Sequence, residues 1–81
     1  MKDTTYIDVR EPSEFASGHI EDGINIPLSS IGESNTELDA LPKDRKVVLY
    51  CRSGARASLA KEQLQAMGYT NVENGINQEE I

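Results

Sequence analysis

The chain has 81 residues, enough for one domain that buries roughly 60 to 65% of the surface it exposes when unfolded. Its one cysteine excludes an internal disulfide, and one cysteine with one histidine cannot complete a four-ligand zinc site. A formal net charge of −6 argues against general affinity for nucleic acid or for an anionic membrane. We therefore expect a single domain over residues 1–81 that holds no metal.

The first third of the chain predicts two short strands with a short helix between them. Residues 6–9 form a β-branched and aromatic run, typical of a strand that stops before Pro12. That proline suits the first position of a helix through residues 13–17, and Gly18 lies just past the helix end. Residues 24–27 predict a second strand, which ends at its own proline.

The rest of the chain predicts a broken helix, a buried strand, a longer helix and a last short strand. Residues 28–41 have only partial helical spacing, and three residues interrupt it: Gly32, Ser34 and Asn35. Residues 46–50 contain the continuous apolar run of a central strand that is covered on both faces. Residues 55–67 predict an amphipathic helix that ends before Gly68, and residues 71–74 predict the last strand.

This alternation of strands and helices predicts an α/β fold, a small parallel β-sheet of about four strands flanked by helices. The longest helix is expected to pack on the sheet through Ala57, Ala60, Leu64 and Met67. Ligands of such sheets gather beyond the carboxyl ends of the strands, and Cys51 stands where the best strand ends and the best helix begins. The sequence therefore predicts a functional cysteine at this edge.

Residues 51–56, which read CRSGAR, favour a reactive thiolate over a buried structural cysteine. Backbone N–H groups that surround a sulfur at a helix N-terminus form an anion site and lower the pKa of a thiol. Gly54 permits the tight curvature, while Arg52 and Arg56 add positive charge. Five of the eight basic residues lie between positions 43 and 56, in a window with a single acid. An anion that approaches this loop therefore meets a locally positive surface.

Four segments of the chain resemble the single-domain rhodaneses, sulfurtransferases of the small phage-shock type. They read YIDVREPSEFASGHI, INIP, VVLYCRSGARA and LQAMGYTNVENG, and they follow the order and spacing of the family over residues 6–75. The resemblance implies a thiosulfate:cyanide sulfurtransferase in which Cys51 takes a sulfane sulfur from a donor such as thiosulfate and becomes a persulfide. The sulfur then passes to cyanide or to a thiol acceptor, which can belong to a protein.

The same resemblance assigns roles to the residues around the cysteine. Substrate binding is expected from the loop residues Arg52, Ser53, Gly54, Ala55 and Arg56. Asp8 and Arg10 match the family's D-V-R segment and His19 its G-H-I segment, so these three are expected to be structural. From the loop geometry we expect Arg56 to turn back toward a carboxylate such as Asp8, whereas Arg52 lies at the mouth of the loop.

Two positions depart from the usual pattern of the family. Asp22-Gly23 stands where the family usually reads Gly-Ala, so we expect the loop after His19 to be set differently. Gly75-Ile76 stands where the family usually reads Gly-Gly.

Other functions fit the sequence less well. Phosphatases and arsenate reductases of related loop architecture place five residues between the cysteine and an arginine, and residue 57 is Ala57 here. A dyad of Cys51 with His19 for acyl transfer lacks a third member, and the carboxylates of Asp8 and Glu11 are more typical of residues that order loops. The alternative from another class is a rhodanese-like binding module without catalysis. The presence of Cys51 argues against it, because a binding pocket needs no nucleophile.

The expected partners are a small anionic sulfur donor and a thiol or cyanide acceptor, with no cofactor, nucleic acid or membrane. No stretch reaches the ~20 apolar residues of a membrane span, and residues 1–5 lack the apolar core of a signal peptide. We therefore expect a monomer in the cytoplasm, or in the periplasm if a signal peptide has been removed from a precursor.

Overall fold

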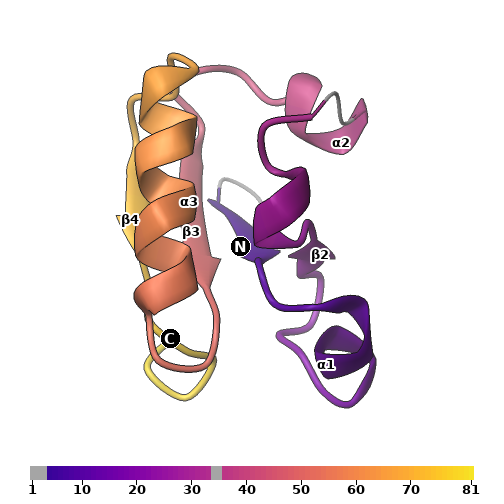
Figure 1. Ribbon diagram of the computed structural model, residues 1–81. Helices are drawn as coiled ribbons and strands as arrows, with labels where there is room; N and C mark the ends of the chain where they lie inside the picture. The colour runs from indigo at the N-terminus through magenta and orange to yellow at the C-terminus, as the bar shows by residue number, and fades with distance from the viewer. Residues whose placement is uncertain (1–3, 34–35) are drawn as a thin grey trace.

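The computed structural model describes residues 4–33 and 36–81 of the chain. Within these residues, the centre of the fold is a sheet of four parallel strands in the order β2-β1-β3-β4 (Figure 1). The strands are β1 (Thr4–Asp8), β2 (Ile24–Asn25), β3 (Lys46–Tyr50) and β4 (Val72–Asn74). The predicted α/β fold with a small parallel sheet is confirmed, and β3 is an interior strand of that sheet.

Two strands differ from the prediction at their ends. β1 begins two residues earlier than predicted and ends at Asp8, and β2 ends two residues earlier than predicted, at Asn25. Hydrogen bonds between the two strands and their neighbours continue past both ends. The N–H of Val9 donates to the carbonyl of Tyr50, and the N–H of Ile26 donates to the carbonyl of Asp8, each at 3.0 Å. Residues just past these strand ends therefore still follow the neighbouring strands, although they lie outside the strand bounds.

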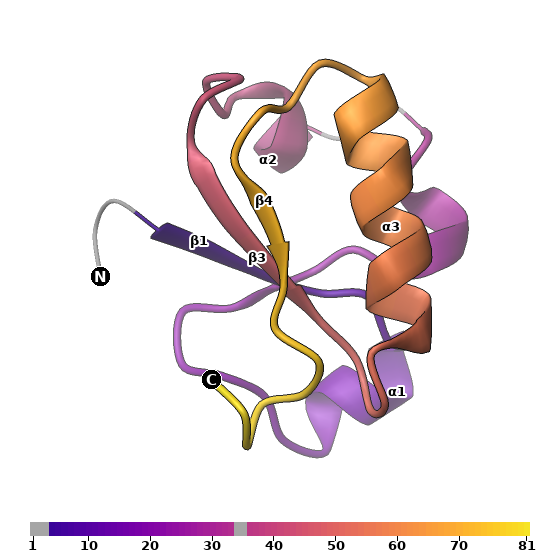
Figure 2. The same ribbon diagram turned by 90° about the vertical axis from the view of Figure 1, so that its left-hand side faces the viewer.

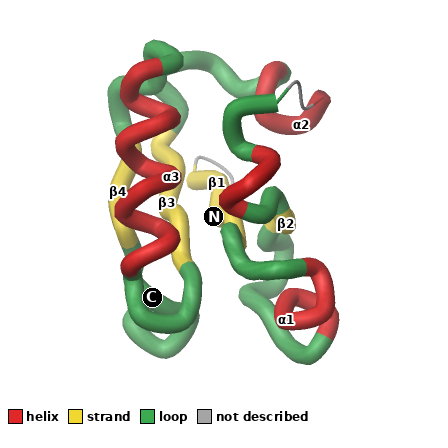
Figure 3. Tube along the Cα trace, viewed as in Figure 1, coloured by secondary structure: helices red, strands yellow, loops and turns green. Residues whose placement is uncertain are grey.

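The described helices are α1 (Pro12–Ala16), α2 (Thr36–Asp39) and α3 (Ala55–Ala66), and a 3-10 turn, η1, spans Leu28–Ser30 (Figure 3). Pro12 opens α1 as predicted, and α3 ends one residue before its predicted end. The broken helix predicted over residues 28–41 is confirmed, because the two short pieces η1 and α2 replace one long helix. The interruption predicted at Ser34 and Asn35 lies outside the described residues.

The hydrophobic core lies between one face of the sheet and α3, which runs alongside the strands (Figure 2). The predicted apolar face of α3 is confirmed: Ala57, Ala60 and Leu64 are fully buried, and Met67 is partly buried against the core. Each fully buried aliphatic side chain of leucine size stabilises the fold by about 1.5 to 3 kcal/mol. The core therefore fixes α3, and with it the loop that joins α3 to β3.

The opposite face of the sheet is covered near Val48 by the C-terminal segment, which we define as residues 75–81. A side chain at Gly75 would come within 3.0 Å of both Val48 and Ile81, so backbone and side chains are in close contact there. β3 is thus buried on both faces, as predicted, with Val48 at 7% exposure and Tyr50 at 0%. This arrangement brings the C-terminal segment beside the loop between β3 and α3 (Figure 1).

Candidate active site

Cys51 follows the last residue of β3 and lies where the strand meets the loop before α3, as predicted. The residue is 2% exposed, and its backbone N–H donates to the carbonyl of Ile76 at 3.0 Å. The loop turns around the sulfur, because the N–H of Gly54 donates to Cys51 Sγ at 3.0 Å. The cysteine is therefore buried as a residue, while its sulfur faces a hydrogen-bond donor of the loop.

The surroundings of the sulfur favour its ionised form. Burial by itself raises the pKa of the Cys51 thiol. Backbone N–H groups outweigh that effect, so the pKa lies below the ordinary value of a thiol. These N–H groups belong to Ala57, Gly54, Ser53 and Arg56. Because thiolates are the nucleophilic form of cysteine, the lowered pKa makes Cys51 more reactive at neutral pH.

Gly54 has a conformation that explains why this position carries no side chain. Its φ of 92° is one that residues with a Cβ rarely adopt. A Cβ on Gly54 would also stand 3.4 Å from Cγ2 of Ile76. The glycine therefore lets the loop turn its N–H toward the sulfur while the C-terminal segment packs against it.

The two arginines of the loop differ: Arg56 turns back toward a carboxylate, as expected, although that carboxylate is not Asp8. Arg56 does not pair with Asp8; its two terminal nitrogens donate to the two carboxylate oxygens of Glu14 in α1, at 2.9 and 3.2 Å. Arg52 has a side chain that is 74% exposed, and its Nη1 lies 3.9 Å from the same carboxylate. Asp8 forms its ion pair with Arg10, and Arg56 forms its own with Glu14 of α1.

Glu14 is a site residue that the sequence analysis missed. Its carboxylate also accepts the N–H of Glu11 at 2.9 Å. The guanidinium of Arg56, together with that N–H, lowers the pKa of Glu14 to about 2. The chain gives little signal for this pairing, because Glu14 and Arg56 are 42 positions apart and Glu14 reads as an ordinary first-turn helix residue.

Asp8 and Arg10 form a buried ion pair at the end of β1. Nη2 of Arg10 lies 2.7 Å from Oδ2 of Asp8, and the same nitrogen donates to the carbonyl of Gly18 at 2.7 Å. The guanidinium also lies 5.8 Å from the ring centroid of Tyr50. The pair therefore links β1 to the loop after α1, a geometry that fits the structural role expected for both residues.

His19 is exposed and is held by α1 rather than by the cysteine. Its Nδ1 lies 2.7 Å from the carbonyl oxygen of Phe15, and the two rings stack with centroids 3.6 Å apart. Across residues 4–33 and 36–81, no hydrogen bond joins His19 to Cys51. This geometry gives no support to a catalytic dyad of these two residues. Glu11 is exposed while Asp8 is buried against Arg10, so the two carboxylates are not a matched pair either.

A cavity of about 280 Å³ opens beside Cys51. Arg52 was expected here from the sequence, whereas the three polar residues of the C-terminal segment that line the other side were not. The lining residues are Arg10, Cys51, Arg52, Asn77, Gln78 and Glu79. The amide of Asn77 donates to the carbonyl of Arg52 at 3.4 Å, which joins the two walls. The cavity is thus polar, with two arginines and one carboxylate near the sulfur.

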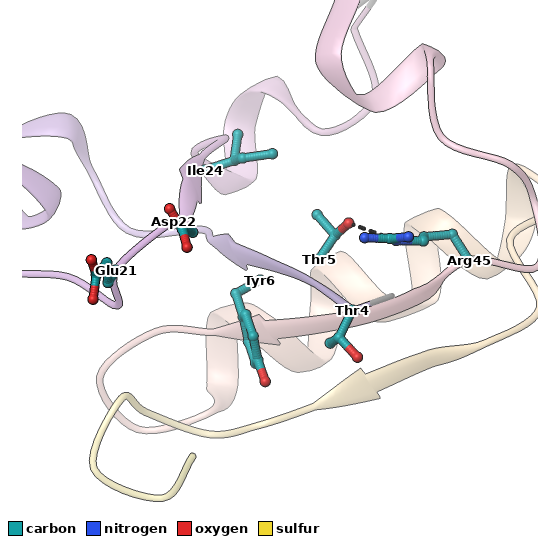
Figure 4. Close-up of a pocket in the computed structure, with 7 residues that line it drawn as sticks. All are labelled: Thr4, Thr5, Tyr6, Glu21, Asp22, Ile24 and Arg45. Atoms are coloured by element: carbon teal, nitrogen blue, oxygen red, sulfur yellow. Dashed lines mark hydrogen bonds between the residues drawn. The ribbon is translucent and has the colours of Figure 1, made fainter. Parts of the chain in front are cut away.

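A larger cavity, of about 420 Å³, lies away from Cys51 at the start of β1 (Figure 4). Its walls include Thr5 and Arg45, whose Nε donates to Thr5 Oγ1 at 3.0 Å, and the acidic residues Glu21 and Asp22. None of the residues predicted for the site lines this cavity. The smaller cavity, which contains the thiol, is therefore the candidate active site.

The described part of the chain offers no cluster of three histidine, cysteine, aspartate or glutamate side chains that could hold a metal ion. No helix among residues 4–33 and 36–81 is both long and apolar enough to cross a membrane.

Comparison with known proteins identifies the family. Residues 1–78 match the family described as Rhodanese-like domain. A sulfurtransferase from Allochromatium vinosum is 42% identical over 73 residues, which cover 90% of this chain and 65% of that protein. The thiosulfate sulfurtransferase PspE of Escherichia coli is 43% identical over 70 residues, which cover 85% of this chain and 65% of PspE. The chain belongs to the rhodanese-like domain family, and it spans about 65% of the length of these two relatives.

The fold agrees with this assignment. A rhodanese from Escherichia coli, solved with anions, superposes with a TM-score of 0.85 at 37% sequence identity. The match covers 96% of this chain and 91% of that one. The resemblance noted in the sequence is therefore confirmed for both family and fold.

The two departures from the family pattern have a common conformational feature. Among the described residues, the only residues other than glycine with a positive φ are Asp22, at 68°, and Ile76, at 74°. Both stand where the family usually has glycine. A branched side chain is unfavourable at such a φ, so Ile76 has a backbone conformation that costs strain.

Proposed function

We propose that this protein transfers a sulfane sulfur from an anionic donor such as thiosulfate to a thiol or to cyanide, through a persulfide on Cys51. The observation that carries the proposal is the position of Cys51 Sγ, which accepts a loop N–H at 3.0 Å and has a lowered pKa beside a cavity lined by two arginines. Membership in a family that includes proteins named sulfurtransferases supports the same chemistry.

The first half-reaction begins with the thiolate of Cys51. The sulfur attacks the outer sulfur of thiosulfate, a new S–S bond forms to Cys51, and the S–S bond of thiosulfate breaks. Sulfite leaves with the electron pair of the broken bond, and the enzyme retains a cysteine persulfide. Arg52, exposed at the mouth of the cavity, favours the approach of the dianionic donor.

The second half-reaction returns the enzyme to its starting state. A thiolate or cyanide acceptor attacks the outer sulfur of the persulfide, and the electron pair of the broken S–S bond returns to Cys51. The backbone N–H groups of the loop stabilise the negative charge on sulfur before and after transfer. Because the donor product leaves before the acceptor reacts, ping-pong kinetics are expected.

The loop supports phosphatase chemistry less well. Arg56, the last cation of the loop, donates two hydrogen bonds to Glu14 and is not among the residues that line the cavity beside Cys51. The next residue, Ala57, is buried against the core. We accordingly favour sulfur transfer, by a monomer that requires no cofactor.

Intact-mass measurement after treatment with thiosulfate tests the proposal directly. The parent is expected to gain about 32 Da, the mass of one sulfur atom, and to lose that mass on addition of cyanide with release of thiocyanate. The Cys51→Ser variant should show neither the adduct nor the product. Binding of thiosulfate without an adduct would favour the non-catalytic binding module. Full activity of Cys51→Ser would overturn the assignment of the nucleophile.

A further inference from the structure

Four hydrogen bonds form a closed ring between the loop of Cys51 and the end of β4. The N–H of Gly54 donates to Cys51 Sγ at 3.0 Å, and the N–H of Cys51 donates to the carbonyl of Ile76 at 3.0 Å. The N–H of Ile76 donates to Oδ1 of Asn74 at 2.9 Å. Nδ2 of Asn74 closes the ring by donating to the carbonyl of Gly54 at 2.9 Å. Apart from the thiol, the amide of Asn74 is the only side chain in this ring.

Asn74 is well placed to act as a fixed point. It is the last residue of β4, and it pairs with Leu49 of the interior strand β3 in the register of the sheet. Its amide uses both ends, since Oδ1 accepts one backbone N–H while Nδ2 donates to a backbone carbonyl. A side-chain amide supplies the acceptor on one atom and the donor on another, so one residue can bind two backbone groups at once. The side chain therefore connects the rigid sheet to the loop.

Gly54, the residue whose carbonyl Asn74 binds, depends on neighbouring residues to fix its backbone conformation. Gly54 has no side chain, and its φ of 92° is one of many conformations open to a glycine. Its carbonyl is bound by Asn74, and its own N–H points at the sulfur. Ile76 also packs over its Cα side, where a Cβ would meet the isoleucine at 3.4 to 3.5 Å. The orientation of this N–H therefore depends on the end of β4.

We propose that Asn74 is a positioning residue for the sulfur chemistry: by holding the carbonyl of Gly54, it keeps the N–H of Gly54 aimed at Cys51 Sγ. The inference rests on the proposed function, because an aimed N–H matters most when sulfur carries the charge of a thiolate or a persulfide. Asn74 is not among the residues that line the cavity beside Cys51, and it acts through the two residues that its amide binds, Gly54 and Ile76.

The test measures the rate at which iodoacetamide alkylates the chain as a function of pH. Cys51 is the only cysteine, so the rate reports this thiol alone. Asn74→Ala removes the donor to Gly54, and its alkylation at pH 6.5 should be about threefold to tenfold slower than that of the parent. Asn74→Asp should be slowed at least as much, because a carboxylate cannot donate and adds negative charge beside the loop.

Asn71→Asp is the matched control. Asn71 is exposed just before β4, so this variant introduces the same charge on the same segment without touching the ring. Its alkylation profile should equal that of the parent. The charged groups near the sulfur stay in place in all variants: Arg10, Arg52 and Glu79 in the cavity, and Arg56 paired with Glu14 behind the loop.

A folded Asn74→Ala variant with the parent's alkylation profile would overturn the proposal. If the variants do not fold, the parent itself provides the test, through the amide resonance of Gly54 in a ¹⁵N NMR titration. That resonance should move with the ionisation of the thiol, and an amide that does not respond would equally overturn the proposal. Neither measurement uses a sulfur donor, so failure here is distinguishable from failure to transfer sulfur.

Discussion

The loop of Cys51 is supported from two sides that use different chemistry. On the side of α1, the supports are charges: Glu14 holds Arg56, and the neighbouring pair of Asp8 with Arg10 fixes the end of β1. On the side of β4, the supports are uncharged: the amide of Asn74 and the backbone of Ile76. Charged contacts respond to pH and to salt. Hydrogen bonds of amide and backbone groups do not, because these groups carry no titrating charge.

The two sides of the loop are expected to affect different properties of the protein. The charged side is built from residues of widely different burial, from a fully buried Asp8 to an Arg52 side chain that is 74% exposed. Buried pairs determine whether the domain folds, while exposed charges act mainly on an approaching anion. The uncharged side instead fixes the direction of a single N–H. Substitutions should therefore separate stability, substrate affinity and thiol reactivity.

The largest effect is expected at the buried pair. Arg10→Ala leaves the carboxylate of Asp8 without its partner at 0% exposure, which should lower the free energy of unfolding by about 3 to 5 kcal/mol. Urea denaturation measures this loss. Lys46→Ala is the control, because it breaks the exposed pair of Lys46 with Glu73, at 3.7 Å, and should cost at most about 1 kcal/mol. Equal losses in the two variants would contradict a special role for the buried pair.

The next effect separates the two arginines of the loop. Arg56→Ala removes two hydrogen bonds to Glu14 and should lower Tm by about 3 to 8 °C, together with turnover. Arg52→Ala should leave Tm nearly unchanged and raise KM for thiosulfate by about threefold to tenfold, because its exposed charge acts on the donor. Thermal melting and steady-state kinetics on both variants check the difference. Equal Tm values for the two variants and the parent would contradict a structural role of Arg56.

A smaller effect follows from the pKa of Glu14, which is about 2 in the folded state and about 4.3 in an unfolded chain. Because the folded state binds this proton less readily, the stabilisation is complete above the unfolded pKa and is lost as the pH falls toward 2. Glu14→Gln should therefore lower Tm by about 2 to 5 °C at pH 7 and by progressively less below pH 4. Glu62→Gln, on the exposed side of α3, controls for the loss of one charge. A difference that stays constant down to pH 3 would contradict the assignment.

The smallest effect is expected at Glu79, the one carboxylate that lines the cavity beside Cys51. Glu79 is exposed and repels an anionic donor only weakly through solvent. Glu79→Gln should lower KM for thiosulfate by about twofold and leave kcat unchanged. Glu80→Gln, next in the chain and outside the cavity lining, should leave KM unchanged. The same decrease in both variants would show a general charge effect rather than a local one.

Local sequence patterns predicted the strand, the cysteine and the helix of the site, because these three are adjacent in the chain. The apolar run of residues 46–50, the cysteine after it and the amphipathic helix from residue 55 follow one another in the chain, so propensity and spacing were enough to place them. Arg56 pairs with a carboxylate as expected, but the sequence did not single out Glu14, because ion pairs between distant segments depend on the fold. Asp8 and Glu14 are equivalent candidates in the sequence, and only the neighbouring Arg10 decides between them.

The conformations of Asp22 and Ile76 show a second limit. The sequence marked both as departures from glycine, yet a departure can mean either a changed backbone or a strained side chain. The structure shows positive φ values of 68° and 74°, a region that is unfavourable for residues with a Cβ. Asparagine, aspartate and glycine tolerate this region better than isoleucine, which makes Ile76 the more strained of the two.

The ring through Asn74 also links the reactivity of the thiol to the order in which the chain is made. Synthesis begins at the N-terminus, so Cys51 leaves the ribosome before Asn74 and Ile76 do. On the role proposed for Asn74, the N–H of Gly54 lacks the contacts that aim it at the sulfur until β4 joins the sheet. The pKa of the Cys51 thiol is then expected to fall to its native level only when β4 has paired with β3.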